Sequence, residues 1–287
     1  MKKATAILTL LGLIFPFILQ AQSGGKVSDN LSVTSKILKM DRKFAIYLPA
    51  DYESSERSYP VLYLLHGSGD DQTGWVQFGE VKNIADKAIQ EGTSTAMIIV
   101  MPDADTGQRG YFNSPKGDWN YEDFFFKELM PHIEKTYRVK TNKRYRAIAG
   151  LSMGGGGTLM YALHHPELFA AACPLSAYVG PISMEEASKR WEKQYEGISK
   201  DELAKYYSNH SALELMNNMP DSQKKAVRWY IDCGDDDFLY EGNSLLHIAM
   251  KKKEVPHEFR VREGAHNWTY WREALPTVLE FVSMSFH

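Results

Sequence analysis

The chain contains few cysteines. Cys173 and Cys233 are the two among its 287 residues, and two cysteines cannot form the disulfide framework of a small secreted domain. Both lie in apolar segments that we expect to be strands, so buried free thiols are the expected state. A single disulfide between neighbouring strands is the alternative, because disulfides form in oxidising compartments.

An excess of charge of either sign is also lacking. Lysine and arginine number 33 against 36 aspartate and glutamate residues, a formal net charge of −3, and the basic residues are scattered. Proteins that bind nucleic acid usually carry a basic stripe, so we expect no nucleic-acid partner. The sequence has no H-E-x-x-H motif and no Cys/His ligand spacing, so we expect no metal and no other cofactor.

The long hydrophobic run stands at the N-terminus, where Lys2 and Lys3 precede "ATAILTLLGLIFPFIL". This run of about 16 residues, interrupted by Pro16, is shorter than the roughly 20 that span a bilayer. With the small Ala21 at a suitable cleavage point, residues 1–21 are predicted to be a signal peptide, and an uncleaved anchor is the alternative. Residues 22–287 then form a single domain that is periplasmic or secreted, without stable membrane insertion.

Short apolar runs alternate with segments of helical periodicity along the rest of the chain. This alternation predicts an α/β fold, with a mostly parallel sheet covered by helices on both faces. The expected strands are residues 42–50, 59–67, 95–102, 144–150, 169–176, 226–234 and 257–264. The expected helices are residues 81–92, 121–137, 241–253 and 268–284, together with a helix after the glycine segment at 154–157.

Residues 181–226 interrupt this alternation with a charged, helical insertion between two late core strands. Two interpretations are open. The insertion is either a cap over a site, with Trp191 and Tyr195 facing inward, or a solvated helical segment with no role in catalysis.

Four consecutive glycines, Gly154 to Gly157, lie inside the apolar stretch "YRAIAGLSMGGGGTLMYAL". A phosphate-binding P-loop would need a lysine after its last glycine, and none follows. A dinucleotide-binding G-x-G-x-x-G pattern fails because Leu159 stands at the position of the third glycine. A flexible linker would not be flanked on both sides by residues that favour burial. These three interpretations are therefore weak.

The pattern that fits is G-x-S-x-G, formed here by Gly150, Ser152 and Gly154. In this motif the serine lies on a tight strand-to-helix turn that exposes its hydroxyl above the sheet. Glycine costs a helix about 1 kcal/mol relative to alanine, so four in a row indicate a steric requirement. They would let the first helical turn approach neighbouring strands and a substrate.

A serine nucleophile needs a base and an acid that orients the base. In the α/β-hydrolase arrangement, the acid and then a histidine follow the serine in the chain. Asp232 lies within an expected strand, whereas the loop after that strand offers three carboxylates. Periodicity does not choose among them; they are Asp235, Asp236 and Asp237.

Among nine histidines, His266 is the best placed, in a loop just after the final strand. His164 and His165 lie about three turns along the helix after Ser152, so we expect them to point away from the serine. The others considered fall in helices or strands, where satisfied or exposed histidines are expected; they are His132, His210, His247 and His257.

An oxyanion hole also belongs to this arrangement. One donor is the backbone N–H after the nucleophile, and the other comes from the loop after an early strand. Met153 supplies the first. The second is expected from Ser68, because Gly67 allows a tight turn there, and the His66 side chain is expected to be structural.

Four blocks occur in order, "YLLHGSGDDQTGW", "AIAGLSMGGGGTLMYALHHPELFAA", "IDCGDDDFLYEGN" and "GAHNWTYWREALP". Together they resemble the esterase family of α/β-hydrolases that includes carbohydrate esterase family 1, S-formylglutathione hydrolases, siderophore esterases and antigen 85. The resemblance covers roughly residues 40–284 and implies the α/β-hydrolase fold. It matches the family's nucleophile to Ser152 and its histidine to His266. The family's Gly-x-x-Asp pattern falls on Gly234 and Asp237, which selects the third acid.

The resemblance implies a serine carboxylic-ester hydrolase that works through an acyl-enzyme on a small ester or an ester-decorated oligosaccharide. Within the family, export favours a feruloyl esterase acting on plant cell-wall polysaccharide esters and disfavours a cytosolic S-formylglutathione hydrolase. The alternatives are an acetylxylan esterase, a siderophore esterase and a serine peptidase of the same fold. A non-catalytic carbohydrate-binding module would not need an intact triad. Aromatic side chains expected near the substrate are Trp75, Trp119, Tyr178 and Trp268.

Overall fold

The computed structural model describes residues 24–105 and 110–287, so the predicted signal peptide lies outside the described residues. The strands are β1 (Lys26–Ser35), β2 (Met40–Leu48), β3 (Val61–Leu65), β4 (Ile98–Pro102), β5 (Arg146–Leu151), β6 (Ala171–Leu175), β7 (Arg228–Gly234) and β8 (His257–Arg262). They form one sheet in the order β1-β2-β4-β3-β5-β6-β7-β8. Strand β2 runs antiparallel to both neighbours, and the pairs from β4 to β8 are parallel.

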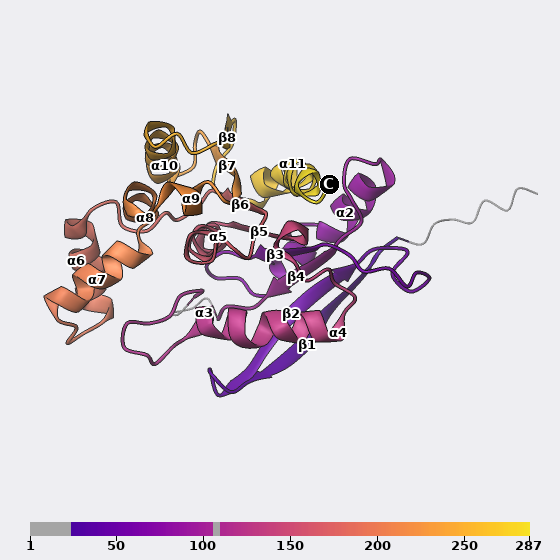
Figure 1. Ribbon diagram of the computed structural model, residues 1–287, viewed down its shortest axis with the longest axis horizontal. Helices are drawn as coiled ribbons and strands as arrows, with labels where there is room; N and C mark the ends of the chain where they lie inside the picture. The colour runs from indigo at the N-terminus through magenta and orange to yellow at the C-terminus, as the bar shows by residue number, and fades with distance from the viewer. Residues whose placement is uncertain (1–23, 106–109) are drawn as a thin grey trace, which may run out of the picture.

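Helices lie on both faces of this sheet (Figure 1). They are α1 (Gly74–Gln77), α2 (Val81–Gln90), α3 (Tyr121–Phe124), α4 (Met130–Thr136), α5 (Met153–His164), α6 (Met184–Gln194), α7 (Lys200–His210), α8 (Ala212–Asn218), α9 (Asp221–Lys224), α10 (Tyr240–Lys252) and α11 (Trp268–Ser285). Tyr63 of β3 belongs to the core that holds α3, α4, α5 and α10, and the next residue, Leu64, belongs to the core that holds α2 and α11. Two cores on two faces confirm the predicted α/β architecture. In the described part of the chain, no helix is long and apolar enough to cross a bilayer.

Two elements differ from the sequence-based expectation. Strand β1 was not predicted, because its sequence "KVSDNLSVTS" is largely polar. In the structure half of its residues are exposed, and it forms by pairing with β2 at the edge of the sheet. The helix expected over 121–137 is divided by a π-helical turn at Phe125–Leu129. Pro131 follows directly in the first turn of α4, and its ring and missing N–H disfavour continuous α-helical hydrogen bonding at that point.

The insertion between β6 and β7 is helical, as expected, and contains α6 to α9. Three serines cap its main helices by accepting a backbone N–H; they are Ser183, Ser199 and Ser211. Residues of α6 and α7 form a small core of their own, separate from the two cores of the sheet. In Figure 1, α6 and α7 project from the left end of the molecule.

The two cysteines are buried free thiols, as expected. They lie on neighbouring strands, but the register that pairs Ala172 with Trp229 and Leu175 with Asp232 sets Cys173 level with Tyr230. Cys233 lies three residues farther along its strand. Strand residues advance about 3.3 Å each, so the two cysteines are well separated along the strand direction. The alternative of a disulfide therefore fails on distance along the strands.

Candidate active site

Ser152 lies on a sharp turn between β5 and α5. Its backbone has φ 53° and ψ −115°, a conformation that non-glycine residues adopt only where the surroundings impose it. The Ser152 N–H donates to Leu175 O at 2.9 Å, and Ser152 O accepts from Tyr178 N–H at 3.0 Å. Bonds to the end of β6 thus hold the turn from both sides of its peptide.

The glycines around Ser152 are required by close backbone approach. A Cβ on Gly150 would lie 2.5 Å from Gly154 O, and a Cβ on Gly154 would lie 2.5 Å from His66 O. A Cβ on Gly156 would lie 2.5 Å from the backbone oxygen of Tyr178. Contacts this short with backbone atoms cannot be relieved by a rotamer change. Glycine at 154 and 156 therefore allows α5 to approach the ends of β3 and β6, as expected from the sequence.

The structure brings Ser152, His266 and Asp237 together from three separate turns. His266 Nε2 lies 2.8 Å from Ser152 Oγ, and Nδ1 lies 2.9 Å from Asp237 Oδ2. Because a carboxylate only accepts, Nδ1 carries the proton and Nε2 is left to accept the serine hydroxyl. This is the tautomer that a general base for Ser152 needs.

The other candidate acids have structural contacts. Asp235 Oδ1 accepts the Gly264 N–H at 2.9 Å and so braces the loop that carries His266. Asp236 is exposed. Asp232 is buried within β7, where its carboxylate accepts from Arg262 and from two tyrosine hydroxyls.

The Asp237 carboxyl is fully buried yet ionised. Burial raises its pKa, but hydrogen bonds from His266, the Leu239 N–H and the Ser176 hydroxyl outweigh burial and lower the pKa below its usual value. A buried carboxylate next to the imidazole stabilises the positive charge that the ring acquires when it takes the Ser152 proton.

Three neighbours of this triad were not predicted from the sequence. Ser176 lies at φ 44° just after β6, and its Oγ accepts the Trp271 Nε1–H at 3.0 Å. Trp271 in turn places its ring edge-on to His266, with centroids 4.9 Å apart, and the Phe238 ring is tilted by 49° to the imidazole, with centroids 4.4 Å apart. No motif marks Ser176 or Trp271, because both reach the site through tertiary packing.

Ser68 and Met153, the predicted oxyanion donors, line the same cavity as Ser152. Met153 is the first residue of α5, and the N–H groups of a first helical turn have no intrahelical acceptor and carry partial positive charge. The loop of Ser68 passes close to the nucleophile, since a Cβ on Gly67 would lie 3.4 Å from Ser152 Cβ. Both residues thus lie beside Ser152, where the oxyanion donors are predicted.

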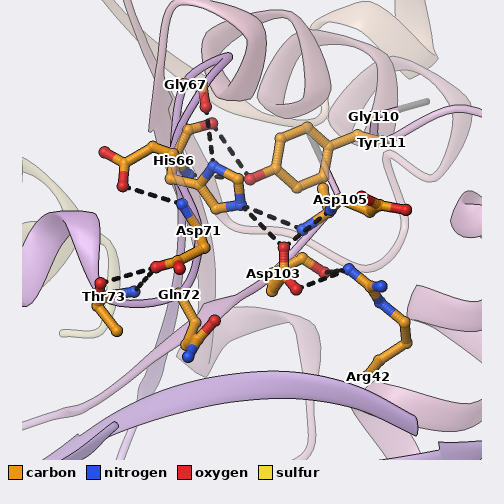
Figure 2. A network of polar contacts seen from close by, with 12 residues as sticks. Arg42, His66, Gly67, Asp71, Gln72, Thr73, Asp103, Asp105, Gly110 and Tyr111 are labelled. Atoms are coloured by element: carbon orange, nitrogen blue, oxygen red, sulfur yellow. Dashed lines mark hydrogen bonds and ion pairs between the residues drawn. The ribbon is translucent and has the colours of Figure 1, made fainter. Parts of the chain in front are cut away.

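His66 fixes this loop and takes no part in the triad. Figure 2 shows its buried ring between the loop and the end of β4. Nδ1 donates to Gly67 O at 2.9 Å, and Nε2 accepts the Ala104 N–H at 3.1 Å. The Tyr111 hydroxyl accepts the His66 N–H at 2.9 Å. Burial lowers the pKa of His66, so the ring is neutral, in agreement with its expected structural role.

A cavity of about 890 Å³ opens above Ser152. One wall comes from the segment 110–119 and another from the insertion, with Arg190, Trp191 and Tyr195 among the lining residues. Of the two interpretations of residues 181–226, the structure therefore supports a cap over the site, here called the cap. It is fastened to the opposite wall, because Tyr206 OH donates to Asn113 O at 3.1 Å.

Two of the four aromatic residues expected near substrate line the cavity, Trp119 and Tyr178. Trp75 does not: its ring is 1% exposed, packs edge-on to Trp268 in the core under α11, and donates Nε1–H to Leu65 O. Trp268 does not line the cavity either, since it packs between Trp75 and Trp271. These two expectations are corrected: both rings are packing residues.

His210 is a cavity residue that the sequence analysis expected to be merely satisfied or exposed. It stacks on Tyr206 with centroids 3.9 Å apart, and Nδ1 donates to Tyr206 O at 3.0 Å. Burial and the neighbouring His164 lower the pKa of His210 to about 4, so it is a neutral, flat part of the wall.

Within residues 24–105 and 110–287, no group of three His, Cys, Asp or Glu side chains is arranged to hold a metal ion.

Comparisons with known proteins agree with this geometry. The family model described as "Putative esterase" matches residues 35–282. An endo-1,4-beta-xylanase/feruloyl esterase of Xylanibacter ruminicola is 37% identical over 80% of this chain, and an esterase of Mycobacterium tuberculosis is 39% identical over 48%. The aligned parts span 28% and 29% of those two relatives. A solved structure described as "ferulic acid esterase" has 37% identity and a TM-score of 0.81, covering 92% of this chain and 99% of that one. The chain belongs to the esterase family of α/β-hydrolases.

Proposed function

We propose that the protein is a serine carboxylic-ester hydrolase that works through an acyl-enzyme. The observation that carries this proposal is the hydrogen-bonded line from Asp237 through His266 to Ser152 at the floor of a cavity. A hydroxyl, an imidazole and a buried carboxylate in this order are the parts that nucleophilic acyl transfer requires.

In the first step, Ser152 Oγ attacks the ester carbonyl carbon while His266 Nε2 takes the hydroxyl proton. The amides of Ser68 and Met153 receive the negative charge that develops on the carbonyl oxygen. The carbon–oxygen bond to the alcohol then breaks, and the departing oxygen takes the proton from Nε2. Water repeats the sequence on the acyl-enzyme, which releases the acid and restores Ser152.

The favoured substrates are feruloyl esters of plant cell-wall polysaccharides. Two observations support this choice over a smaller acyl group. The cavity under the cap is large, and eight of its lining residues are Phe, Tyr or Trp, among them Trp119, Tyr178, Trp191 and Tyr206. Two similar proteins, each 37% identical, are described as a ferulic acid esterase and an endo-1,4-beta-xylanase/feruloyl esterase.

Steady-state hydrolysis of methyl ferulate and of an acetylated xylo-oligosaccharide, by the wild type and by Ser152→Ala, tests the proposal. We expect methyl ferulate to be the better substrate and Ser152→Ala to lower kcat about 10⁵- to 10⁶-fold, with an unchanged thermal unfolding midpoint. Faster release of acetate would keep the mechanism and replace feruloyl by acetyl. Substantial activity in a folded Ser152→Ala variant would contradict the mechanism itself.

We also propose that the protein is exported and that its signal peptide ends at Ala21. The support is the N-terminal sequence alone: a basic start, a short apolar run and a small residue before a polar segment. N-terminal sequencing of protein recovered from the periplasm or the medium should begin at Gln22. Recovery of the whole chain, with Met1 intact, in the cytoplasm would contradict export.

A further inference from the structure

Phe238 is an exposed apolar side chain beside the catalytic histidine. It follows Asp237 in the turn between β7 and α10, and 71% of it is accessible, more than of any other large hydrophobic side chain in the described ranges. Its ring centroid lies 4.4 Å from that of His266, and it lines the cavity that holds Ser152. A ligand in the cavity can therefore cover this ring, and removing its surface from water stabilises the complex.

The direction of the reaction says which part of an ester reaches Phe238. The proton on His266 Nε2 passes to the departing oxygen, so the leaving alcohol must lie against the imidazole. The buried side of that ring is taken by Trp271, which is 5% exposed. Phe238 occupies a side that is open to solvent. The acyl carbon is bonded to Ser152, and its carbonyl oxygen faces the predicted oxyanion amides.

We propose that Phe238 is the surface that contacts the leaving alcohol, which is a sugar in the favoured substrates. This rests on the proposed ester hydrolysis and adds a residue that selects the leaving group. A sugar ring has a flat face of C–H groups that can cover an exposed phenyl ring while its hydroxyls stay in water.

Phe238→Ala separates this role from a general effect on His266. The two substrates share the feruloyl group: methyl ferulate, whose methanol cannot reach the ring, and a feruloylated pentose oligosaccharide. We expect kcat/KM for the oligosaccharide ester to fall about 5- to 10-fold more than kcat/KM for methyl ferulate, with the difference mainly in KM. Phe238→Trp should restore the oligosaccharide value, because it restores a flat apolar surface.

Tyr240→Ala is the matched control, since Tyr240 is 58% exposed two residues farther along and does not line the cavity. It should leave both substrates unchanged. The measurement is repeated with a second pair of substrates, a methyl ester and an oligosaccharide ester of acetic acid, because the leaving-group site does not depend on the acyl group. Equal losses on methyl and sugar esters in Phe238→Ala would overturn the proposal and leave the esterase function standing. Failure of the wild type to cleave either pair would contradict the proposed function and the sugar site together.

Discussion

The catalytic turns and the cap are stabilised in different ways. Ser152, Asp237 and His266 lie on short turns at the ends of β5, β7 and β8, and their turns are held by backbone hydrogen bonds and glycine contacts. Within the cap, α6 and α7 have a small core of their own, whereas α8 packs Ala212 and Met216 into the core of the sheet. Side-chain bonds join α7 to the rest of the molecule, Tyr206 to Asn113 and His164 to Asn209. The sheet thus determines the position of the reacting atoms, and the cap forms much of the surface that a substrate meets.

Asp237→Asn should have the largest effect, because it acts on the reacting atoms. An amide removes the charge that stabilises the imidazolium and permits the wrong tautomer of His266, so we expect kcat to fall about 10⁴-fold with little change in KM. The measurement is steady-state hydrolysis of methyl ferulate. Asp236→Asn, an adjacent and exposed control, should retain full activity. A loss below about tenfold in Asp237→Asn would mean that another carboxylate orients His266.

Gly154→Ala should come next. The added Cβ would meet His66 O at 2.5 Å and Leu65 O at 2.6 Å, so either α5 or the backbone at the end of β3 must move. We expect the free energy of unfolding, measured in urea, to fall by about 1–3 kcal/mol, together with kcat.

Gly157→Ala provides the comparison for this variant, because its Cβ would meet only side-chain atoms of Leu65 and Tyr111, at 3.0 Å. Side chains can adjust, and alanine favours a helix by about 1 kcal/mol over glycine. The loss in the free energy of unfolding should therefore be smaller in Gly157→Ala than in Gly154→Ala. Equal stability losses in the two variants would show that backbone contact is not what requires glycine at 154.

Trp191→Ala tests the cap and should affect substrate choice more than the chemical step. Trp191 lines the cavity and packs edge-on to Tyr206, with centroids 4.9 Å apart. We expect kcat/KM for methyl ferulate to fall about tenfold and that for a small acetyl ester to change less than about twofold. Glu192→Ala, at the exposed neighbouring position, is the control. An equal loss on both esters would assign Trp191 to the stability of the cap instead of to acyl recognition.

The smallest effect concerns pH and the joint between cap and body. His164 Nδ1 lies 2.7 Å from Glu122 Oε1, and Nε2 lies 2.7 Å from Asn209 O near the end of α7. Both partners are acceptors, so the ring must carry both protons. Burial lowers the pKa of His164, but the hydrogen bond to Glu122 and the negative charge of Glu122 outweigh burial and raise it. Burial raises the pKa of Glu122, but hydrogen bonds from His164 and His165 outweigh it and lower this pKa to about 2.

A raised histidine pKa means that this stabilisation is complete below the unfolded value of 6.5 and is lost as the pH rises through the folded value. We expect the free energy of unfolding to fall by about 1 kcal/mol over that rise. In His164→Gln this dependence should be absent. The measurement is urea unfolding across the neutral and mildly alkaline range. An identical pH dependence in His164→Gln would show that another group is responsible.

Much of the catalytic arrangement could be predicted because it is local or ordered along the chain. The G-x-S-x-G pentapeptide marks Ser152, the alternation of strands and helices predicts the sheet, and each partner follows a strand. The structure also places Asp237, which periodicity alone did not distinguish from Asp235, against His266. Trp75 and Trp268 were assigned wrongly because an aromatic side chain near a motif can face either the cavity or the core, and the sequence does not encode which.

The fold class, the strand-to-helix turn at Ser152 and the order of serine, acid and histidine could be predicted without coordinates, because they depend on hydrophobic periodicity and on backbone conformations that few residues permit. Three features required the folded chain: the insertion covers the site, Ser176 and Trp271 support the triad, and Phe238 lies exposed beside His266. These features depend on contacts between segments far apart in the chain, and such contacts leave no pattern in either segment alone.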